Sequence, residues 1–405
     1  MVFSSMEFLF GFLVVVLVVY YNPIFKGRTF RNTVLLLASL AFYGWGEPVF
    51  VFLMMLSILM TWFVGLRMDR SDGHKKNWLT VGIGLHVLLL FVFKYVSFLS
   101  KELSELLSAD WLRINISLPI GISFFTFQLM SYLFDVYYGK TKVQKNLAWL
   151  ALYVSLFPQL IAGPIVRYEQ IADEILNRRE NKADFVAGIQ RFVYGMAKKL
   201  LISNYVAVLT DNIFSLSASQ SISVMSAWLG AISYALQIYF DFSGYSDMAI
   251  GLGQMCGFHF WENFNYPYVS KSITEFWSRW HISLGTWFRD YVYIPLGGSR
   301  VSKGKHVRNI FLVWLLTGIW HGANWTFVVW GLYYFALLML EKNLKFTDRL
   351  GWFSHVYAMV FVIIGSTIFR AESLGLALRY LGQMFGLGEA RLPTRCFGRL
   401  CKAER

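Results

Sequence analysis

The sequence predicts an all-α, polytopic membrane protein. Of its 405 residues, 56% are hydrophobic, 18% are aromatic and only 15% are charged, whereas an ordinary soluble domain carries roughly 25% charged residues. Disorder is excluded because disordered chains are poor in apolar residues. A secreted disulfide scaffold is excluded because the chain has only three Cys. The apolar residues therefore belong to helices that cross a membrane.

Apolar runs separated by basic loops define the first spans. No cationic segment precedes the first run, which predicts a retained helix rather than a signal peptide. Lysine and arginine in the loops after the first, third and fifth runs place those loops in the cytoplasm and the amino terminus outside. The runs are Phe8–Tyr21, Thr33–Tyr43, Val49–Leu66, Leu79–Phe93 and Leu118–Tyr138.

Two short segments of the first half do not fit a simple span. Glu102–Leu112 is amphipathic and predicts an interfacial helix. Leu147–Gly163 is apolar but is interrupted by Pro158 and followed by Pro164, so we interpret it as a re-entrant segment.

In the second half, apolar residues between 185 and 200 recur at helical spacing, with Arg191 and Lys199 on the other side. This pattern predicts an amphipathic helix on the cytoplasmic surface, serving as a membrane anchor or as a rim for a partner. The residues from Arg370 onward are polar and basic and are expected in the cytoplasm. Further apolar spans are expected at Leu200–Leu216, Met225–Leu252 and Phe353–Phe369, and Trp314–Leu340 is a long apolar run with a polar interior.

The formal net charge is +13. In a soluble protein this excess would indicate nucleic-acid binding. Here the basic residues lie between apolar runs, where they set topology and contact anionic lipid. We therefore expect no nucleic-acid partner.

Histidines within apolar surroundings are the first candidates for chemistry, because ionisable groups at membrane depth are costly. His321 lies between Gly318 and Trp325, and its neighbouring glycines allow a helix or a substrate to approach closely. A neutral imidazole there can accept a proton from a hydroxyl, although a helix-packing role explains it almost as well. His281 lies in an alternation of aromatic and charged residues that fits a polar cavity, whereas His86 is expected to be a packed, hydrogen-bonded core residue.

Two roles are possible for each of four further charged residues. Arg289 and Asp290 either line a cavity with His281 or form an interfacial ion pair. Asp241 and Asp247 are six residues apart, so they do not share one face of a regular helix. They serve either catalysis or the capping of a broken helix.

Several motifs are absent from the sequence. It has no G-x-x-x-x-G-K-[ST] phosphate loop, no G-x-S-x-G elbow and no H-E-x-x-H zinc motif. Cys256, Cys396 and Cys401 have no suitable histidine nearby and form a poor metal site. We therefore predict no metal centre.

Taken together, several motifs resemble the membrane-bound O-acyltransferase family, and most closely its bacterial alginate O-acetylation branch. The resemblance runs from Val2 to about Glu372. It rests on the segments 118–124, 159–164, 241–247, 262–265, 275–298 and 320–324.

The resemblance implies a ring of about 9–11 transmembrane and re-entrant helices around a central funnel or tunnel, formed by residues 1–372. Residues 373–405 are expected to be a basic polar tail. Relatives continue through further membrane segments, which predicts a truncated or altered carboxyl terminus.

The resemblance also implies the chemistry. The residue matching His321 is the catalytic histidine of the family, and His281 matches its second invariant histidine. An acetyl group would pass from a cytoplasmic thioester such as acetyl-CoA, with no tightly bound cofactor, to hydroxyls of an extracytoplasmic polysaccharide. Periplasmic acetyltransferases or polysaccharide-modifying proteins would complete the transfer at the bacterial inner membrane. The residues predicted to line the tunnel are Trp280, Trp320, Arg289, Asn324, Asp241 and Asp247.

Other functions remain open at this stage. Intramembrane His and Asp also suit a transporter of an acetylated intermediate that performs no chemistry. A scaffold that recruits periplasmic enzymes is a further possibility. Relatives that acetylate peptidoglycan or load D-alanine offer different acceptors and donors.

Overall fold

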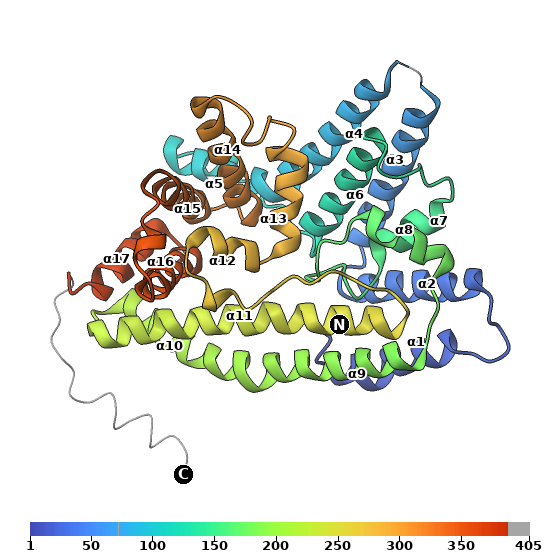
Figure 1. Cartoon of the computed structure of the whole chain (residues 1–405), viewed down its shortest axis with the longest axis horizontal. Coiled ribbons are helices and arrows are strands. Elements are labelled where there is room, and N and C mark those ends of the chain that lie inside the picture. The colour runs from blue at the N-terminus through green and yellow to red at the C-terminus, as the bar shows by residue number, and fades with distance from the viewer. Residues whose placement is uncertain (72, 388–405) are drawn as a thin grey trace, which may run out of the picture. The chain divides into compact units, whose positions relative to one another are not determined.

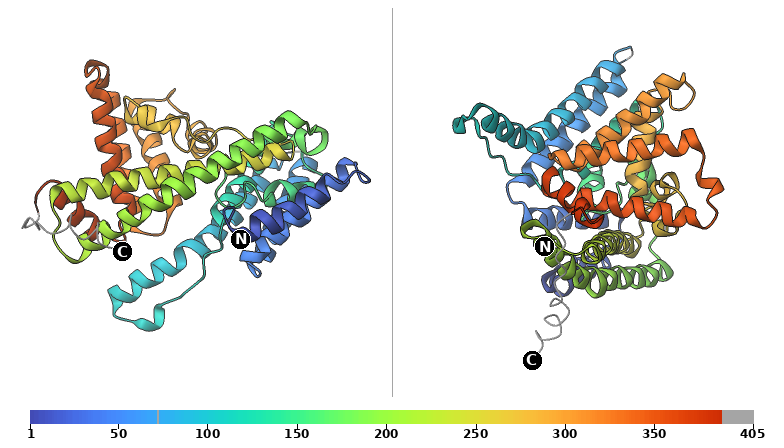
Figure 2. Two further views of the ribbon diagram at one scale, coloured as in Figure 1. Left: turned by 90° about the horizontal axis from the view of Figure 1, so that it is seen from below. Right: turned by 90° about the vertical axis from the view of Figure 1, so that its left-hand side faces the viewer.

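The computed structural model describes residues 1–71 and 73–387. Within these ranges the chain is built from helices and contains no strand (Figure 1 and Figure 2). The predicted all-α class is therefore confirmed.

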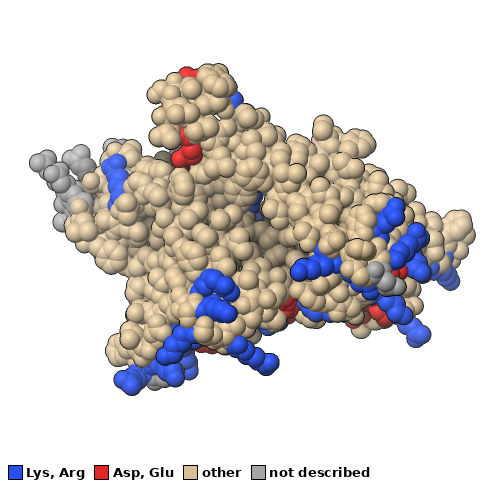
Figure 3. All heavy atoms as spheres, turned by 90° about the horizontal axis from the view of Figure 1, so that it is seen from above, with Lys and Arg blue, Asp and Glu red and all other residues tan. Residues whose placement is uncertain are grey.

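Among the described residues, five helical stretches are long and apolar enough to cross a membrane: Phe50–Arg70, Lys75–Leu107, Lys182–Ser219, Trp325–Leu344 and Phe353–Arg370. Many of their large apolar side chains are exposed on the protein surface. In Figure 3 the charged side chains gather in patches, and wide areas of the visible face carry none. A surface of this kind suits contact with lipid, and the chain is a multi-pass membrane protein.

Two predicted boundaries were wrong because no helix breaker lies where we expected a break. The expected interfacial helix at 102–112 is mostly the end of a continuous helical stretch. In that stretch α4 (Lys75–Leu90) passes through a π-helical turn into α5 (Val96–Leu107). The stretch ends where Ser108 adopts a left-handed backbone conformation. Likewise, the amphipathic helix α9 (Lys182–Ala197) runs on into α10 (Asn204–Ser219).

The chain divides into two compact units. The first contains residues 1–197, 243–265 and 279–301, and the second contains residues 198–242, 266–278 and 302–405. The helix α11 (Val224–Met255) contributes residues to both. Because His281 belongs to the first unit and His321 to the second, each histidine is described within its own unit.

The first unit packs α2 (Arg28–Gly46), α3 (Phe50–Arg70), α4, α6 (Ile122–Tyr137) and α7 (Leu147–Ser155) against one another. Its core includes a cluster of aromatic rings from Phe3, Phe8, Phe42 and Phe157. His86 is fully buried, and its Nε2 lies 2.7 Å from the hydroxyl of Thr61. His86 is therefore the hydrogen-bonded core residue that we predicted.

Helices α9 and α11 cross with their backbones in contact, as four glycines allow. A Cβ at Gly251 would lie 2.5 Å from the carbonyl oxygen of Gly188, and a Cβ at Gly195 would lie 2.5 Å from that of Gly244. In each helix the two glycines are seven residues apart, which returns them to the same face after two turns. Small residues at these positions bring the two backbones together, as at many membrane helix crossings.

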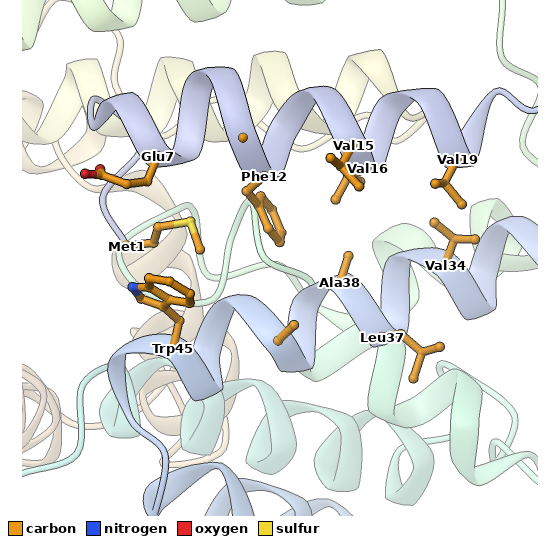
Figure 4. A pocket seen from close by; sticks show the side chains of 12 residues that line it. Met1, Glu7, Phe12, Val15, Val16, Val19, Val34, Leu37, Ala38 and Trp45 are labelled. Carbon is orange, nitrogen blue, oxygen red and sulfur yellow. The ribbon is translucent and has the colours of Figure 1, made fainter.

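An apolar groove lies between the first helix and α2 (Figure 4). The helix from Glu7 through α1 (Leu13–Tyr20) faces α2 across it, and its volume is about 590 Å³. Figure 4 shows Val16 and Val19 facing Val34 and Ala38. The lining is almost entirely apolar, which fits contact with lipid acyl chains.

One buried carboxylate connects three arginines in the first unit. Glu180 forms ion pairs with Arg28 at 2.6 Å and Arg31 at 2.5 Å, and Arg178 lies 3.7 Å away. Burial alone would raise the pKa of Glu180, but hydrogen bonds from Arg28 and Tyr20 outweigh it and lower the pKa to about 2. Glu180 therefore stays ionised and ties the beginning of α2 to the loop before α9.

The second unit contains α14 (Lys303–His321), α15 (Trp325–Leu344), α16 (Phe353–Arg370) and α17 (Leu374–Met384). The long apolar run at Trp314–Leu340 belongs to a hairpin of two helices, α14 and α15, and its polar interior contains the turn at Gly322-Ala323-Asn324. Within the predicted tail, α17 buries Tyr380 and Met384 against neighbouring helices. Cys396, Cys401 and the remainder of the tail lie outside the described residues.

Candidate functional site

His281 lies in the turn between two short helices, α12 (Ile273–Arg279) and α13 (Ile282–Phe288). Its side chain is buried, and its Nδ1 lies 3.2 Å from Oδ1 of Asn263. The backbone of Asn263 also binds this turn, because its carbonyl accepts a hydrogen bond from the amide of Ile282 at 3.0 Å. Asn263 is thus the residue that orients His281.

The hydrogen bonds around Asn263 define the tautomer of His281. The backbone amide of Ser283 is 3.2 Å from Oδ1 of Asn263, and its hydroxyl is 2.9 Å away. An amide N–H can only donate, so the atom of Asn263 that faces it must be the oxygen. Nδ1 of His281 must then donate to the same oxygen, and in the neutral ring Nε2 carries no proton. Nε2 is therefore the atom of His281 that can accept one.

The backbone of His281 is in the left-handed region, with φ at 45°. A non-glycine residue in this conformation costs on the order of 1–3 kcal/mol and persists only where its surroundings hold it. Here the pairing of the segments around Asn263 and Arg279 supplies that restraint, because the amide of Asn265 donates to the carbonyl of Arg279 at 2.9 Å.

We expect Asn263→Leu to reduce the acyl transfer that the resemblance implies by about 100-fold, because a displacement of about 1 Å in a reacting group can cost that much. The apolar side chain leaves the Ser283 amide without its acceptor and releases the His281 ring. Asn263→Asp, which keeps the acceptor oxygens, should restore a large part of the activity. Initial rates in membranes, normalised to the amount of folded protein, test this. Equal losses in both variants would show that Asn263 has only a structural role.

The predicted lining residues near His281 occupy different environments. The ring of Trp280 packs edge-on against Phe264 at 5.1 Å. Arg289 is largely exposed and pairs with Asp290 at 2.7 Å, and the buried Arg167 reaches the same carboxylate at 2.7 Å. The structure thus shows the ion-pair alternative that the sequence left open for Arg289 and Asp290, and it adds Arg167.

His321 is the last residue of α14, and aromatic rings surround it. The centroid of its ring lies 5.0 Å from those of Trp320 and Trp330 and 5.1 Å from that of Phe369. Phe327 lies 6.4 Å away. These rings belong to α14, α15 and α16, so three helices together hold the imidazole in place.

The glycines near His321 allow a helix to approach rather than an open substrate path. At Gly318 and Gly322 a Cβ would collide with Phe327 of α15. The predicted lining residue Asn324 is the N-cap of α15, where its Oδ1 accepts a hydrogen bond from the amide of Thr326 at 3.0 Å. Its amide nitrogen donates to the carbonyl of Glu372 at 2.8 Å. Asn324 thus fixes the turn that follows His321.

Asp241 and Asp247 both form ion pairs, and they belong to different units. Asp241 pairs with Lys199 in the second unit. In the first unit Asp247 pairs at 3.0 Å with Arg191, which also binds Glu262 at 2.6 Å. Since α11 is continuous through both residues, the capping of a broken helix does not explain them. Their assignment to the lining remains a prediction.

His259 lies in the first unit between two carboxylates, 2.8 Å from Glu174 and 3.2 Å from Asp184. Burial alone would lower its pKa, but the hydrogen bonds and charges of these partners outweigh it and raise the pKa. The interaction of protonated His259 with its two carboxylate partners stabilises the folded protein. This stabilisation is fully present below the unfolded pKa of about 6.5 and is lost as the pH rises through the folded pKa.

We expect the melting temperature of the protein to exceed that of His259→Gln by a larger margin at pH 5.5 than at pH 9. The effect should be small, because His259 is half exposed to solvent. Thermal unfolding of the detergent-solubilised protein at both pH values measures it. A margin independent of pH would contradict the assignment.

Sequence reasoning missed a carboxylate that supports the aromatic rings around His321. Glu341 of α15 is buried and accepts hydrogen bonds from the amides of Ile273 at 2.6 Å and Thr274 at 3.0 Å. It thereby holds α12, whose Trp277 contacts Trp330 at 5.4 Å. The sequence signal was an isolated Glu at the end of an apolar run.

The structure brings His281 together with Asn263 and Ser283, and His321 together with Trp320, Trp330 and Phe369. The proximity of the two histidines remains an implication of the resemblance. In residues 1–71 and 73–387 no three His, Cys, Asp or Glu side chains cluster in a way that could hold a metal ion.

The fold and these sites define a multi-pass, all-α membrane protein with buried histidines. Residues 37–369 match the model of the membrane-bound O-acyltransferase family. The chain belongs to this family and is an O-acyltransferase.

Several relatives match nearly the whole chain. Proteins named "Probable alginate O-acetylase AlgI" from Pseudomonas putida and Pseudomonas aeruginosa are 43% and 44% identical to it. The matches cover 97% of this chain in both cases and 82% and 76% of the relatives. A protein named "Peptidoglycan O-acetyltransferase" from Helicobacter pylori is 34% identical over 97% of this chain and 81% of its own length.

Proposed function

We propose that this enzyme moves an acetyl group from a cytoplasmic thioester such as acetyl-CoA towards hydroxyl groups of an extracytoplasmic polysaccharide. The setting of His321 carries the proposal, because an imidazole held by rings from three helices can act as a positioned base. Alginate is the favoured polymer, since the relatives named for it are 43–44% identical and the relative named for peptidoglycan is 34% identical.

In the proposed reaction His321 accepts the proton of the acceptor hydroxyl while its oxygen attacks the thioester carbonyl. Collapse of the tetrahedral intermediate breaks the carbon–sulfur bond, and the protonated histidine returns the proton to the leaving thiolate. The products are an acetyl ester and a free thiol. His281, with Nε2 as its acceptor atom, orients the donor or shares the proton.

The enzyme would lie in the bacterial inner membrane, surrounded by lipid. Periplasmic acetyltransferases or other polysaccharide-modifying proteins would act as its partners and complete the transfer. Thioester donors are made in the cytoplasm, and the aromatic, proton-accepting site lies within the membrane part of the chain, which supports this arrangement.

The experiment uses the purified full chain in lipid nanodiscs with acetyl-CoA labelled in the acetyl group. We expect release of CoA and formation of labelled ester on mannuronate oligosaccharides. Transport of an acetylated compound with no thioester cleavage would support the carrier alternative and overturn the enzyme. Transfer to peptidoglycan fragments, or of D-alanine instead of acetyl, would correct the acceptor or the donor.

A further inference from the structure

The apolar groove between the first helix and α2 is long enough for one lipid acyl chain. Its lining runs from Glu7 to Val19 along the first helix, a length of about 18 Å at 1.5 Å per residue. One membrane leaflet contributes about 15 Å, half of a hydrocarbon core of about 30 Å. Val16 is buried at the base of the groove, whereas Val15 and Leu37 are largely exposed. The groove is therefore open to the surrounding lipid.

The two helices run antiparallel, so the ends of the groove differ (Figure 4). At one end Val19 faces Val34, next to the loop that joins the helices. Glu7 and Trp45 lie at the other end. The carboxylate of Glu7 interacts with the amino group of Met1, so this end offers no excess of positive charge.

Positive charge gathers at the end near Val34. Arg31 lies one helical turn before Val34 along α2. It is one of three arginines that share the single carboxylate of Glu180, so the group keeps two positive charges in excess. The side chains of Arg28 and Arg31 are 24% and 17% exposed, which leaves them within reach of a second anion. Lys26 adds an exposed cation in the loop before α2.

The same loop places these cations at the depth of lipid headgroups. Ile24 and Phe25 expose their apolar side chains, and Lys26 follows them directly. Apolar side chains next to cations are typical of segments at the boundary between acyl chains and headgroups. Because the same cations predict a cytoplasmic loop, a lipid held here belongs to the cytoplasmic leaflet.

We propose that this groove binds an acyl chain of one anionic phospholipid, whose phosphate headgroup contacts Lys26, Arg28 and Arg31. The inference goes beyond acyl transfer and does not depend on it. Since the excess charge lies at one end only, the headgroup lies near Val34 and the acyl chain runs toward Phe12. A zwitterionic lipid with the same acyl chains has no net charge on its headgroup and should bind more weakly.

The test measures lipid binding to the purified full chain by native mass spectrometry, during titration with phosphatidylglycerol or with phosphatidylcholine of the same acyl chains. Val15→Trp obstructs the groove, and Val18→Trp is the matched control. The two valines lie on the same helix and are 61% and 66% exposed, but Val18 is not part of the lining. We expect one phosphatidylglycerol to bind at least about fivefold more tightly than phosphatidylcholine. Val15→Trp should weaken this binding at least about tenfold, because the acyl chain loses its apolar contacts, and Val18→Trp should leave it nearly unchanged.

The headgroup contact is tested with Lys26→Gln. We expect this variant to bind phosphatidylglycerol about fivefold more weakly, which corresponds to about 1 kcal/mol for one cation near anionic lipid. Binding of phosphatidylcholine should not change. Lys76→Gln is the matched control, because it removes an exposed cation at the beginning of α4 and should affect neither lipid.

Equal affinities of the wild-type chain for the two lipids would overturn the proposal, since the headgroup would then not be recognised. Equal effects of Val15→Trp and Val18→Trp would place the bound lipid elsewhere on the surface and would also overturn it. A wild-type dimer that Val15→Trp converts into monomers would show that a second copy of the chain occupies the groove instead of lipid.

Discussion

Replacing His321 by alanine is expected to abolish measurable acyl transfer, with a loss of about 10²–10⁴-fold, the range of a positioned general base. Four aromatic rings contact the imidazole, those of Trp320, Phe327, Trp330 and Phe369. These rings cannot take over its role, because their carbon faces accept no proton and an indole N–H only donates.

The measurement is ester formation in membranes, with the amount of folded protein determined in parallel. His355→Ala is the matched control, because His355 lies near the beginning of α16, at the end opposite Phe369. It should retain wild-type activity. Polysaccharide acetylation that persists in His321→Ala at normal protein levels would refute the catalytic role and favour a scaffold or a carrier.

The second large effect is expected from Gly251→Val, which should prevent most of the protein from folding stably. A Cβ at this position meets the Gly188 carbonyl oxygen at 2.5 Å and the Phe192 amide nitrogen at 2.8 Å. Both atoms belong to the backbone of α9, so no side-chain rotation relieves the contact. Overpacking in a core typically costs about 1–3 kcal/mol, and forcing two helices apart lies at or beyond the upper end of that range.

Gly84→Val is the matched control for the helix crossing. Gly84 lies on the exposed face of α4, where a Cβ would meet no atom within 4 Å. Size-exclusion profiles of detergent extracts after heating give the stability of each variant. Gly251→Val should lose its monodisperse peak at temperatures that Gly84→Val tolerates. Equal stability of the two variants would contradict the close crossing.

The sequence predicted the helices well and their ends less well. Apolar runs identify spans because lipid excludes unsatisfied backbone groups. The continuous helices at 75–107 and 182–219 were missed because polar residues indicate a membrane boundary and do not break a helix. The polar interior of the run at Trp314–Leu340 was noted, but the turn at Gly322-Ala323-Asn324 was not predicted, because so short a polar segment also fits a continuous helix.

For the sites, sequence reasoning identified single residues but not their partners. Trp320 was predicted beside His321 because it is adjacent in sequence, whereas Trp330 and Phe369 required the packing of three helices. Asn263 was part of a recognised motif, yet its role depends on a hydrogen bond across 18 residues. Arg191 and Asp247 were both noted, but their ion pair depends on the crossing of α9 and α11.

The aromatic rings that surround His321 come from one continuous part of the chain, and this has a consequence for folding. The rings described around His321 come from residues 320–369, and Asn263 and Ser283 lie within 18 residues of His281. Contacts of short sequence separation cost little loop-closure entropy. By contrast, Tyr20 reaches the carbonyl of Cys256 across 236 residues. Both histidine environments can therefore form early during membrane insertion, and slow folding should concentrate in the long-range contacts that join the amino-terminal helices to α11.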